Sequence, residues 1–499
     1  MKRAVVLVVF LFLFLNNSFS FLENNRQSLS IYIGFFNIDT KNLYSYPKEV
    51  INLLYEPLFT VNQKENKLIP VLAESWRIYE KGKVWFFKLR NNVKWADGKD
   101  FSADDVVYSF ADLKEKGIIA EKVSNYVVKI IFPDFTYPFY GRLPLILPAH
   151  IKSEYRIGTG PFYMKEYIPN KEISFEKNIY YWRKDKANNQ LPYLDRITIS
   201  LENRDVDIKK IEEKDLKNIS SYERDYNIYN LGLDFLSDVL LINQNPYAPI
   251  PKYKLKLFQN VNFRRALSHA INREKIIEKV YWGYAGIREN PIHPLSCFYT
   301  KNIFEFNYNL DLARNLLESL GLRDRDKDGY LEDLSGNKLE FEVLVNHNEI
   351  VRKIAEIIKD DFEKLGIKLT ISDKNNINIY LYQTFNWELI LTRYDWGIYP
   401  EENSNVFLSK GDKHFWFPYQ RRPYFDWEKE LDILFNNYLV GSNLTTKKIN
   451  MYKLQRLWSN KVPLITITSP YVIYMAKKDI NNFKPDLFLG PLWNSYELF

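Results

Sequence analysis

The segment from Asp324 to Glu332 has the spacing of a calcium-binding loop. Oxygen ligands fall at positions 1, 3, 5, 7 and 9, and Gly329 stands at position 6, where such a loop turns sharply. Position 12, which normally supplies a bidentate Glu, is Ser335. The segment therefore predicts either a polar hairpin loop before the strand at 339–345 or a structural calcium ion of weak affinity. The expected ligands are Asp324, Asp326, Asp328, Tyr330 and Glu332.

Aromatic side chains are abundant, with 11 Trp, 36 Tyr and 34 Phe, and several of them gather in predicted loops of the last quarter of the chain. Aromatic walls suit a cleft that closes on varied ligands, because they bury area without requiring one polar pattern. The same side chains could equally form a core, and the sequence leaves both alternatives open. The residues in question are Tyr394, Trp396, Tyr399, Phe415, Trp416, Phe417 and Tyr419.

Motifs of the common catalytic centres are missing from the sequence. It contains no Gly-x-Ser-x-Gly, no His-Glu-x-x-His and no glycine-rich phosphate loop. The histidines lack the spacing of metal ligands, and His269 falls inside a predicted helix over 263–271, where we expect it to be packed or capped. We therefore expect a binding protein and not an enzyme, with no cofactor apart from the calcium ion. The histidines are His150, His269, His293, His347 and His414.

Length and charge bound the domain count and the partners. A chain of 499 residues with 46% hydrophobic content is too long for one core, so two or three domains are expected. The formal net charge of +7 comes from basic residues interleaved with acids, as between Lys209 and Lys217. This pattern predicts a solvated surface and excludes nucleic-acid binding.

The N-terminus has the features of a secretory signal peptide. Met1-Lys2-Arg3 is followed by an apolar run from Ala4 to Leu15 and by small residues at Ser18 and Ser20. The apolar run is too short for a stable membrane span, although a membrane anchor is the alternative. Cys297, which we expect to pack internally, is the one cysteine, so no lipid-acceptor cysteine follows the apolar run. We expect cleavage after Ser20 and a soluble periplasmic product that is not a lipoprotein.

Hydrophobic periodicity divides the mature chain into a region that is mostly strands and a region in which helices alternate with strands. Residues 59–155 read mostly as strands, with one helix for which Ser102 and Asp105 form a capping box and Gly117 provides the end. After residue 245, amphipathic helices alternate with strands, as in the helix over 350–365 that precedes the strand at 367–371. This alternation predicts an α/β lobe.

Several stretches resemble the family 5 solute-binding proteins, the peptide, dipeptide and nickel receptors of ABC importers. The longest is WFFKLRNNVKWADGKDFSADDVVYSF, from Trp85 to Phe110. Further motifs similar to those of the family occur at Pro70–Trp76, Asn262–Ala285 and Asn309–Gly321, in the same order along the chain as in the family. The resemblance implies an α/β fold of the two-lobed periplasmic-binding-protein clamshell type (type II), with an extra strand-rich subdomain inserted in lobe I.

The resemblance also implies where the chain passes between the lobes. We expect hinge crossings near 158–162, 240–245 and 469–470, because few contacts should cross there and glycine tolerates wide backbone excursions. The implied division is a signal peptide at 1–20, lobe I at 21–58, 157–245 and 470–499, the inserted subdomain at 59–156, and lobe II at 246–469.

Peptide receptors of this family carry an R-x-x-W-x-x-D-Y segment that faces the cleft, and Leu391 to Pro400, LTRYDWGIYP, is similar. By resemblance, Arg393 serves a carboxylate and the backbone beside Trp396 pairs with a peptide main chain. The aspartate that would bind an α-ammonium is missing before Tyr399, which leaves an N-blocked, longer or non-peptide ligand open. Asp395, Glu401 or Glu402 could substitute for it, and Arg393 could instead bridge Asp395 or a neighbouring strand. The expected ligand-binding residues are Arg393, Tyr394, Trp396, Gly397, Tyr399, Phe35, Asn37 and Trp416.

The function implied by the resemblance is a monomeric periplasmic receptor. It would capture a peptide or similar extended solute by hinge closure and deliver it to a membrane ABC permease/ATPase complex. Receptors for a nickel chelate or an oligosaccharide are the alternatives on the same fold. A secreted hydrolase or folding factor with an aromatic groove is the alternative from another class of protein.

Overall fold

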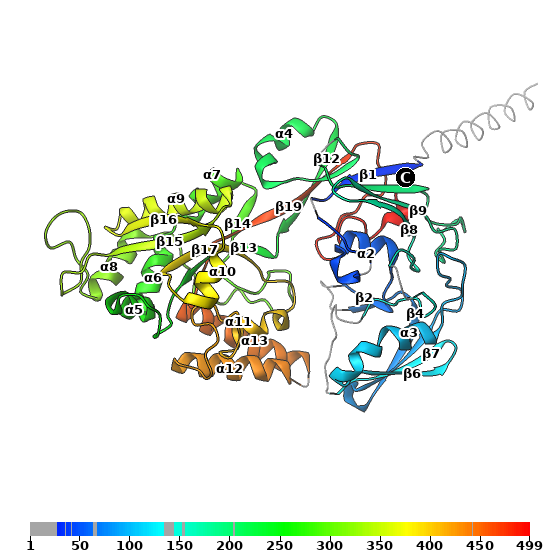
Figure 1. Ribbon diagram of the computed structural model, residues 1–499, viewed down its shortest axis with the longest axis horizontal. Helices are drawn as coiled ribbons and strands as arrows, with labels where there is room; N and C mark the ends of the chain where they lie inside the picture. The colour runs from blue at the N-terminus through cyan, green and yellow to red at the C-terminus, as the bar shows by residue number, and fades with distance from the viewer. Residues whose placement is uncertain are drawn as a thin grey trace, which may run out of the picture.

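The computed structural model describes residues 27–34, 36–40, 42–62, 67–133, 144–151, 155–202, 205–441 and 443–499. Two lobes lie side by side along the longest axis of the molecule (Figure 1). The first lobe holds the N-terminal strand and the C-terminus, and the second holds most of the chain from residue 236 to residue 467. The predicted signal peptide and Phe35 lie outside the described residues.

The sheet of the first lobe has the strand order β12-β19-β11-β1-β10-β9-β8, and an eighth strand, β14 (Ala285–Ile287), comes from the second-lobe part of the chain and attaches to β19. β1 (Ser28–Tyr32) pairs in parallel with β10 (Arg196–Ser200) and β11 (Ile208–Lys210). β8 (Phe162–Ile168) and β9 (Glu172–Lys177) form an antiparallel hairpin at one edge. The helix α2 (Lys48–Leu54) buries Val50 and Leu53 in the same core as Phe175 of β9.

A strand-rich subdomain is inserted between α2 and β8. It contains the hairpin β2 (Phe59–Asn62) and β3 (Lys67–Pro70), and a sheet in the order β4 (Ala73–Tyr79), β5 (Val84–Leu89), β7 (Val127–Ile131) and β6 (Ile119–Ser124). The helix α3 (Ala103–Ser109) starts at the predicted capping box, in which Ser102 N donates to Asp105 Oδ2 at 2.9 Å and Asp104 N to Ser102 Oγ at 3.2 Å. The predicted end at Gly117 is wrong for this helix: α3 ends at Ser109, and Gly117, with a left-handed φ of 78°, instead closes the 3₁₀ turn Ala111–Lys116 that follows it.

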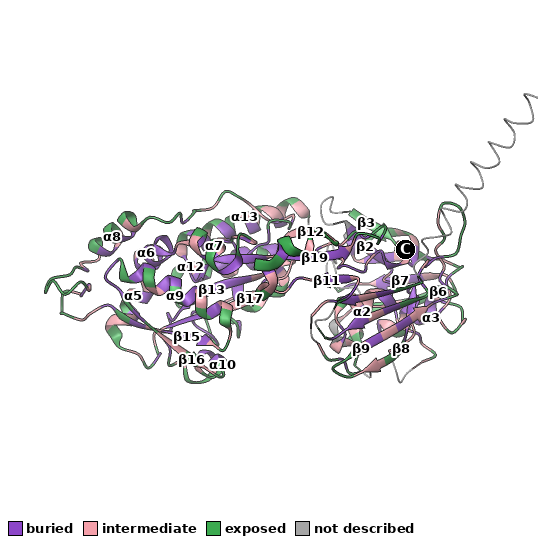
Figure 2. Ribbon diagram, turned by 90° about the horizontal axis from the view of Figure 1, so that it is seen from above, coloured by how far each residue is buried: buried purple, intermediate pink, exposed green. Residues whose placement is uncertain are grey.

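The second lobe is a three-layer sandwich around a five-stranded sheet in the order β16-β15-β17-β13-β18. Its strands are β13 (Leu236–Ile242), β15 (Glu340–Asn346), β16 (Lys368–Lys374), β17 (Leu389–Asp395) and β18 (Ile465–Thr466). Helices α5 (Lys252–Gln259), α6 (Val261–Ala270), α7 (Arg273–Tyr281), α8 (Leu310–Ser319) and α9 (Glu349–Glu363) share a core with one face of this sheet. Helices α11 (Ser404–Phe407), α12 (Asp426–Leu439) and α13 (Leu444–Lys461) share a core with the other face. Figure 2 shows the buried strands running through the middle of each lobe.

The chain passes between the two sheets at two tight connections. β12 (Tyr226–Leu233) belongs to the first sheet and β13 to the second, so the change falls at Asp234 and Phe235. This is earlier than the crossing predicted at 240–245, because β13 already pairs with β17 from Leu236 onwards. The return falls at Ile467, between β18 and β19 (Thr468–Lys477), close to the crossing predicted at 469–470.

Within the described part of the chain, no helix combines the length and the apolar character needed to cross a membrane.

Candidate functional site

Arg393 lies on β17 directly opposite Asp238 of β13. Because side chains alternate along a strand, Arg393 shares a face with Leu389 and Leu391, whereas Tyr394 leaves the opposite face. Arg393 Nε lies 3.3 Å from Asp238 Oδ1. The structure therefore realises the alternative in which Arg393 bridges to a neighbouring strand, and it does not bring Arg393 together with Tyr394 and Trp396.

The guanidinium of Arg393 has a second carboxylate partner. Glu213, in the 3₁₀ turn Glu213–Asn218 between β11 and β12, accepts from Arg393 Nη1 at 2.9 Å and Nη2 at 2.5 Å. Burial by itself would lower the pKa of Arg393, but Glu213, Tyr281 and Asp238 hold it above the usual value. This bidentate pair joins a turn that follows a strand of the first sheet to the sheet of the second lobe.

Asp238 is the buried centre of this cluster, with 1% of its surface exposed. Its Oδ2 accepts hydrogen bonds from Tyr281 Oη at 2.8 Å and from Thr468 Oγ1 at 2.6 Å. Burial raises the pKa of Asp238, while Arg393 and the two hydroxyl donors oppose the rise. The carboxylate thus holds together α7, β17 and the start of β19 at the junction of the two lobes.

Four further predicted ligand-binding residues lie at the end of β17 and in the loop after it: Tyr394, Trp396, Gly397 and Tyr399. Trp396 is 1% exposed and donates from Nε1 to Ser237 Oγ at 2.8 Å. Tyr394 is half-buried, donates to Asn403 Oδ1 at 3.0 Å and stands edge-on to Trp396 with ring centroids 4.8 Å apart. Tyr399 packs against the core of the inserted subdomain, so this loop reaches from the second lobe to the first. Gly397, between Trp396 and Tyr399, has a left-handed φ of 59°.

The carboxylates that could replace the missing aspartate are engaged locally. Asp395 Oδ1 accepts from Gly397 N at 2.8 Å. Glu401 Oε2 accepts from Tyr438 Oη at 2.5 Å. These contacts stabilise the loop after β17.

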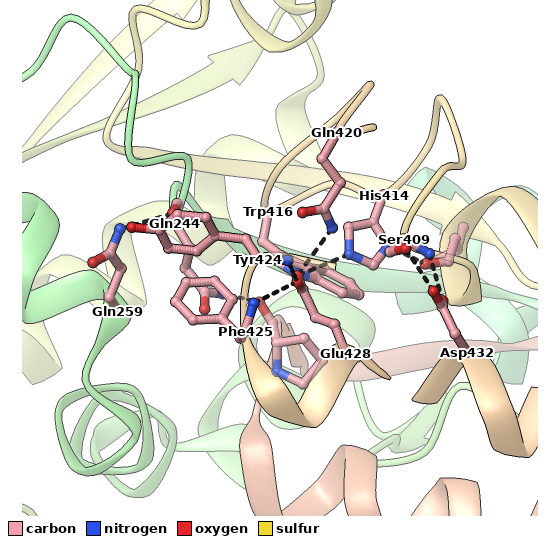
Figure 3. Close-up of polar contacts among 12 residues, drawn as sticks. Gln244, Gln259, Ser409, His414, Trp416, Gln420, Tyr424, Phe425, Glu428 and Asp432 are labelled. Carbon is pink, nitrogen blue, oxygen red and sulfur yellow. Dashed lines mark hydrogen bonds and ion pairs between the residues drawn. The ribbon is translucent and has the colours of Figure 1, made fainter. Parts of the chain in front are cut away.

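Trp416 lies in the core of the second lobe and is fully buried. Figure 3 shows its indole beside His414 and Gln420, all three pointing at the carboxylate of Glu428. Glu428 Oε1 accepts from Trp416 Nε1 at 2.8 Å, and from His414 Nε2 and Gln420 Nε2 at 3.1 Å. Burial alone would raise the pKa of Glu428, but these donors and the backbone N–H of Phe425 lower it. At this position the packing alternative fits the structure, and it does so at Phe415 and Phe417 as well, which are also buried.

A cavity of about 500 Å³ lies in the first lobe, where segments far apart in the chain meet. Phe488, in the C-terminal segment, lies 5.6 Å from the ring of Phe235, so this wall reaches the crossing between the lobes. The C-terminal segment has no periodic pattern and none of the recognised motifs, so its place in this wall was not predictable from the sequence. Asn37 does not line the cavity; it is exposed and accepts from Tyr167 Oη at 3.3 Å. The residues that line the cavity include Asn52, Tyr55, Glu56, Thr60, Tyr181, Arg183, Asp486, Phe488, Leu489, Trp493 and Tyr496.

The charged groups of this cavity are paired within its own wall. Glu56 is 6% exposed and accepts from Trp182 Nε1 at 2.7 Å and from Tyr181 Oη at 3.2 Å. Arg183 Nη2 lies 3.3 Å from Glu56 Oε1. Asp486 Oδ1 accepts from the backbone N–H groups of Phe488 and Leu489 at 2.8 and 2.9 Å. What the cavity offers to a ligand is therefore mainly aromatic surface and backbone polar groups.

Comparisons with known proteins agree with this architecture. A family model described as "Bacterial extracellular solute-binding proteins, family 5 Middle" matches residues 67–415. The chain is 27% identical over 375 residues to a probable ABC transporter-binding protein of Deinococcus radiodurans, and 28% over 360 residues to an oligopeptide-binding protein of Bacillus subtilis. These alignments cover 63% and 64% of this chain, and 63% and 64% of the relatives' own lengths.

Solved structures are similar over nearly the whole chain. The Campylobacter jejuni protein NikZ, in complex with Ni(L-His), gives a TM-score of 0.73 at 22% identity, covering 95% of this chain and 99% of that one. The Brucella suis protein NikA, in complex with Fe(III)-EDTA, gives 0.79 at 20% identity, covering 95% and 100%. At these identities the likeness shows the fold, a two-lobed clamshell.

Proposed function

The chain belongs to the bacterial extracellular solute-binding proteins of family 5, and from this premise we propose that it is a periplasmic receptor for an extended solute. It captures the solute between its lobes and delivers it to a membrane ABC permease/ATPase complex, acting as a monomer. Members of this family are binding proteins, which fits the lack of catalytic motifs in the sequence. The division into lobes and inserted subdomain is also part of this proposal, with the crossing to lobe II at Asp234 and Phe235 in place of 240–245.

The observation that carries the proposal is the aromatic cavity of the first lobe, whose lining residue Phe488 contacts Phe235 at the crossing between the lobes. Tyr399, in the loop after β17 of the second lobe, packs against the core of the inserted subdomain. A solute held between these two surfaces would contact both lobes, and such contacts favour the closed state over the open one. Tyr394, Gly397 and Tyr399 are the residues of the second lobe that we assign to the ligand, with Arg393 considered separately below.

The proposed ligand is a peptide or a similarly extended solute that needs no strong ionic anchor. The fork of Arg393 already holds two carboxylates, and the charges of the cavity are paired. A neutral oligosaccharide is a second candidate, because aromatic side chains with few free charges also suit sugar rings. A relative from Rhizobium meliloti, 24% identical over 517 residues, is described as a periplasmic alpha-galactoside-binding protein.

Ligand binding can be tested on the natively purified protein. Mass spectrometry of the solute released on denaturation identifies the ligand class, and titration of mixed peptides, nickel-histidine or galactosides should raise the melting temperature and change tryptophan fluorescence. We expect Tyr399→Ala to weaken binding by about 3–10-fold through loss of one aromatic contact. The matched control is Tyr247→Ala, which removes a tyrosine of the second lobe that is 79% exposed. Turnover of a substrate without saturable binding would instead support a hydrolase.

Export is proposed to follow the signal-peptide pathway. We expect the mature protein to begin at Phe21 and to be recovered from the periplasm in soluble form. Intact mass of the exported protein checks this directly. A full-length N-terminus in the membrane fraction would contradict the proposal, and so would a lipid-modified one.

A further inference from the structure

We propose that the loop from Asp324 to Glu332, between α8 and β15, binds a calcium ion. The loop is closed at its base by paired backbone groups, since Arg323 N donates to Glu332 O at 3.1 Å and Glu332 N to Arg323 O at 3.0 Å. Carboxylate oxygens of Asp324, Asp326 and Glu332 lie within 4.8 Å of one another. One ion at their centre can therefore contact all three side chains.

Backbone hydrogen bonds fix the direction of the aspartates. Gly329, with a left-handed φ of 92°, donates from N to Asp324 Oδ2 at 3.0 Å. Asp328 N donates to Asp326 Oδ1 at 3.2 Å, and Tyr330 N to Asp328 Oδ1 at 2.9 Å. The clustered carboxylates of Asp324, Asp326 and Glu332 hold like charges close together, and a bound cation relieves their repulsion.

Glu332 provides a second, independent observation that points to a cation. The residue is buried, with a relative exposure of 5%. Oε1 accepts from Arg325 N at 2.8 Å, whereas the buried Oε2 has no hydrogen-bond partner among the described residues. An ionised oxygen buried without a partner is costly, and a metal ion in the adjacent carboxylate cluster supplies the partner.

Lys338 limits the affinity of the site for calcium. Its ammonium lies 3.1 Å from Asp326 Oδ2 and also pairs with Asp328. It therefore competes with the ion for two of the four carboxylates, and Ser335 replaces the usual bidentate glutamate. Oxygen ligands in an irregular loop suit calcium better than magnesium, which requires a near-ideal octahedron. The loop lies at the end of the second lobe away from the first lobe (Figure 1), so the ion stabilises that lobe and does not touch the solute.

The test uses the whole mature protein, stripped of metal with a chelator and titrated with CaCl₂ by calorimetry and thermal melting. Calcium should raise the melting temperature, and Asp324→Asn and Glu332→Gln should abolish the increase. Lys338→Met should tighten calcium binding at least threefold, because it removes the competing ammonium. Asp311→Asn is the matched control, since this carboxylate of α8 is 92% exposed and lies outside the loop.

Asp324 is exposed, so Asp324→Asn keeps the test valid even where Glu332→Gln fails to fold. Calcium binding that survives Asp324→Asn would overturn the assignment. So would the lack of any heat or melting shift at millimolar calcium in both the wild type and Lys338→Met. Saturable binding of Mg²⁺ with no response to Ca²⁺ would replace calcium by magnesium and refute the proposal as stated.

Discussion

Replacing Arg264 by lysine should lower the free energy of unfolding by about 3 kcal/mol. Arg264 is 1% exposed and donates Nε to Val462 O at 2.8 Å, Nη1 to Phe258 O at 2.7 Å and Nη2 to Lys461 O at 2.7 Å. These carbonyls close the C-terminal ends of α5 and α13, where the helix dipole also favours a cation. A lysine has no planar fork and cannot serve three acceptors in fixed directions.

Arg265 provides the matched control for this prediction. It follows Arg264 on α6, is partly exposed and donates Nη2 to Asn460 O at 2.8 Å. Arg265→Lys should cost less than about 1 kcal/mol, because water can serve the carbonyl that it leaves. Urea unfolding followed by circular dichroism measures both variants. Similar small losses of unfolding free energy in the two lysine variants would show that the three buried hydrogen bonds of Arg264 contribute little to stability.

Arg393→Ala should destabilise the protein by about 3–5 kcal/mol, because it leaves the buried carboxylate of Asp238 without its cation. Adding Asp238→Asn should recover part of this loss, since the amide oxygen can still accept from Tyr281 and Thr468 without a charge. Arg352→Ala is the control: it breaks an ion pair with Asp373 in which the arginine side chain is 48% exposed, and should cost less than about 1 kcal/mol. Thermal or urea unfolding measures the series. If the double variant is as unstable as Arg393→Ala alone, the explanation by a buried, unpaired charge is contradicted.

The same arginine is predicted, from the resemblance, to contact an anionic or carbonyl oxygen of the ligand. In that case Arg393→Ala, studied where it remains folded, should weaken binding at least tenfold, or about 1.4 kcal/mol. Glu213→Gln separates this role from the structural one, because it removes the carboxylate charge that pairs with the Arg393 guanidinium and leaves the pair with Asp238 in place. It should strengthen binding of an anionic solute and leave binding of a neutral one unchanged. Equal affinities in the wild type and Arg393→Ala would refute the ligand contact.

Local features of the fold were predictable, whereas contacts across the chain were not. The cap at Ser102 is confirmed. It is set by residues within one helical turn. The partner of Arg393, by contrast, lies 180 positions away at Glu213, and nothing in the local sequence indicates such a pair.

The aromatic residues illustrate the same limit at the candidate site. Trp416 and Tyr419 stand in the same sequence neighbourhood, yet Trp416 is fully buried and Tyr419 is 56% exposed. The buried indole of Trp416 donates a hydrogen bond to Glu428, which lies twelve residues along the chain on α12. Composition and spacing show that aromatic residues gather there. Which of them face solvent depends on packing that only the folded chain defines.

The strand β19 has a mechanical consequence for closure of the lobes. It pairs with β14 (Ala285–Ile287) of the second lobe through Thr468–Pro470, and with β12 and β11 of the first from Tyr471 onwards. Tyr471 N donates to Tyr284 O at 2.9 Å and Asp234 N to Pro470 O at 2.8 Å, so the ladder continues across the junction. A hydrogen-bonded ribbon resists bending in its own plane and yields to torsion. The lobes should therefore rotate about the long axis of this ribbon, with its amide protons protected from exchange throughout the motion.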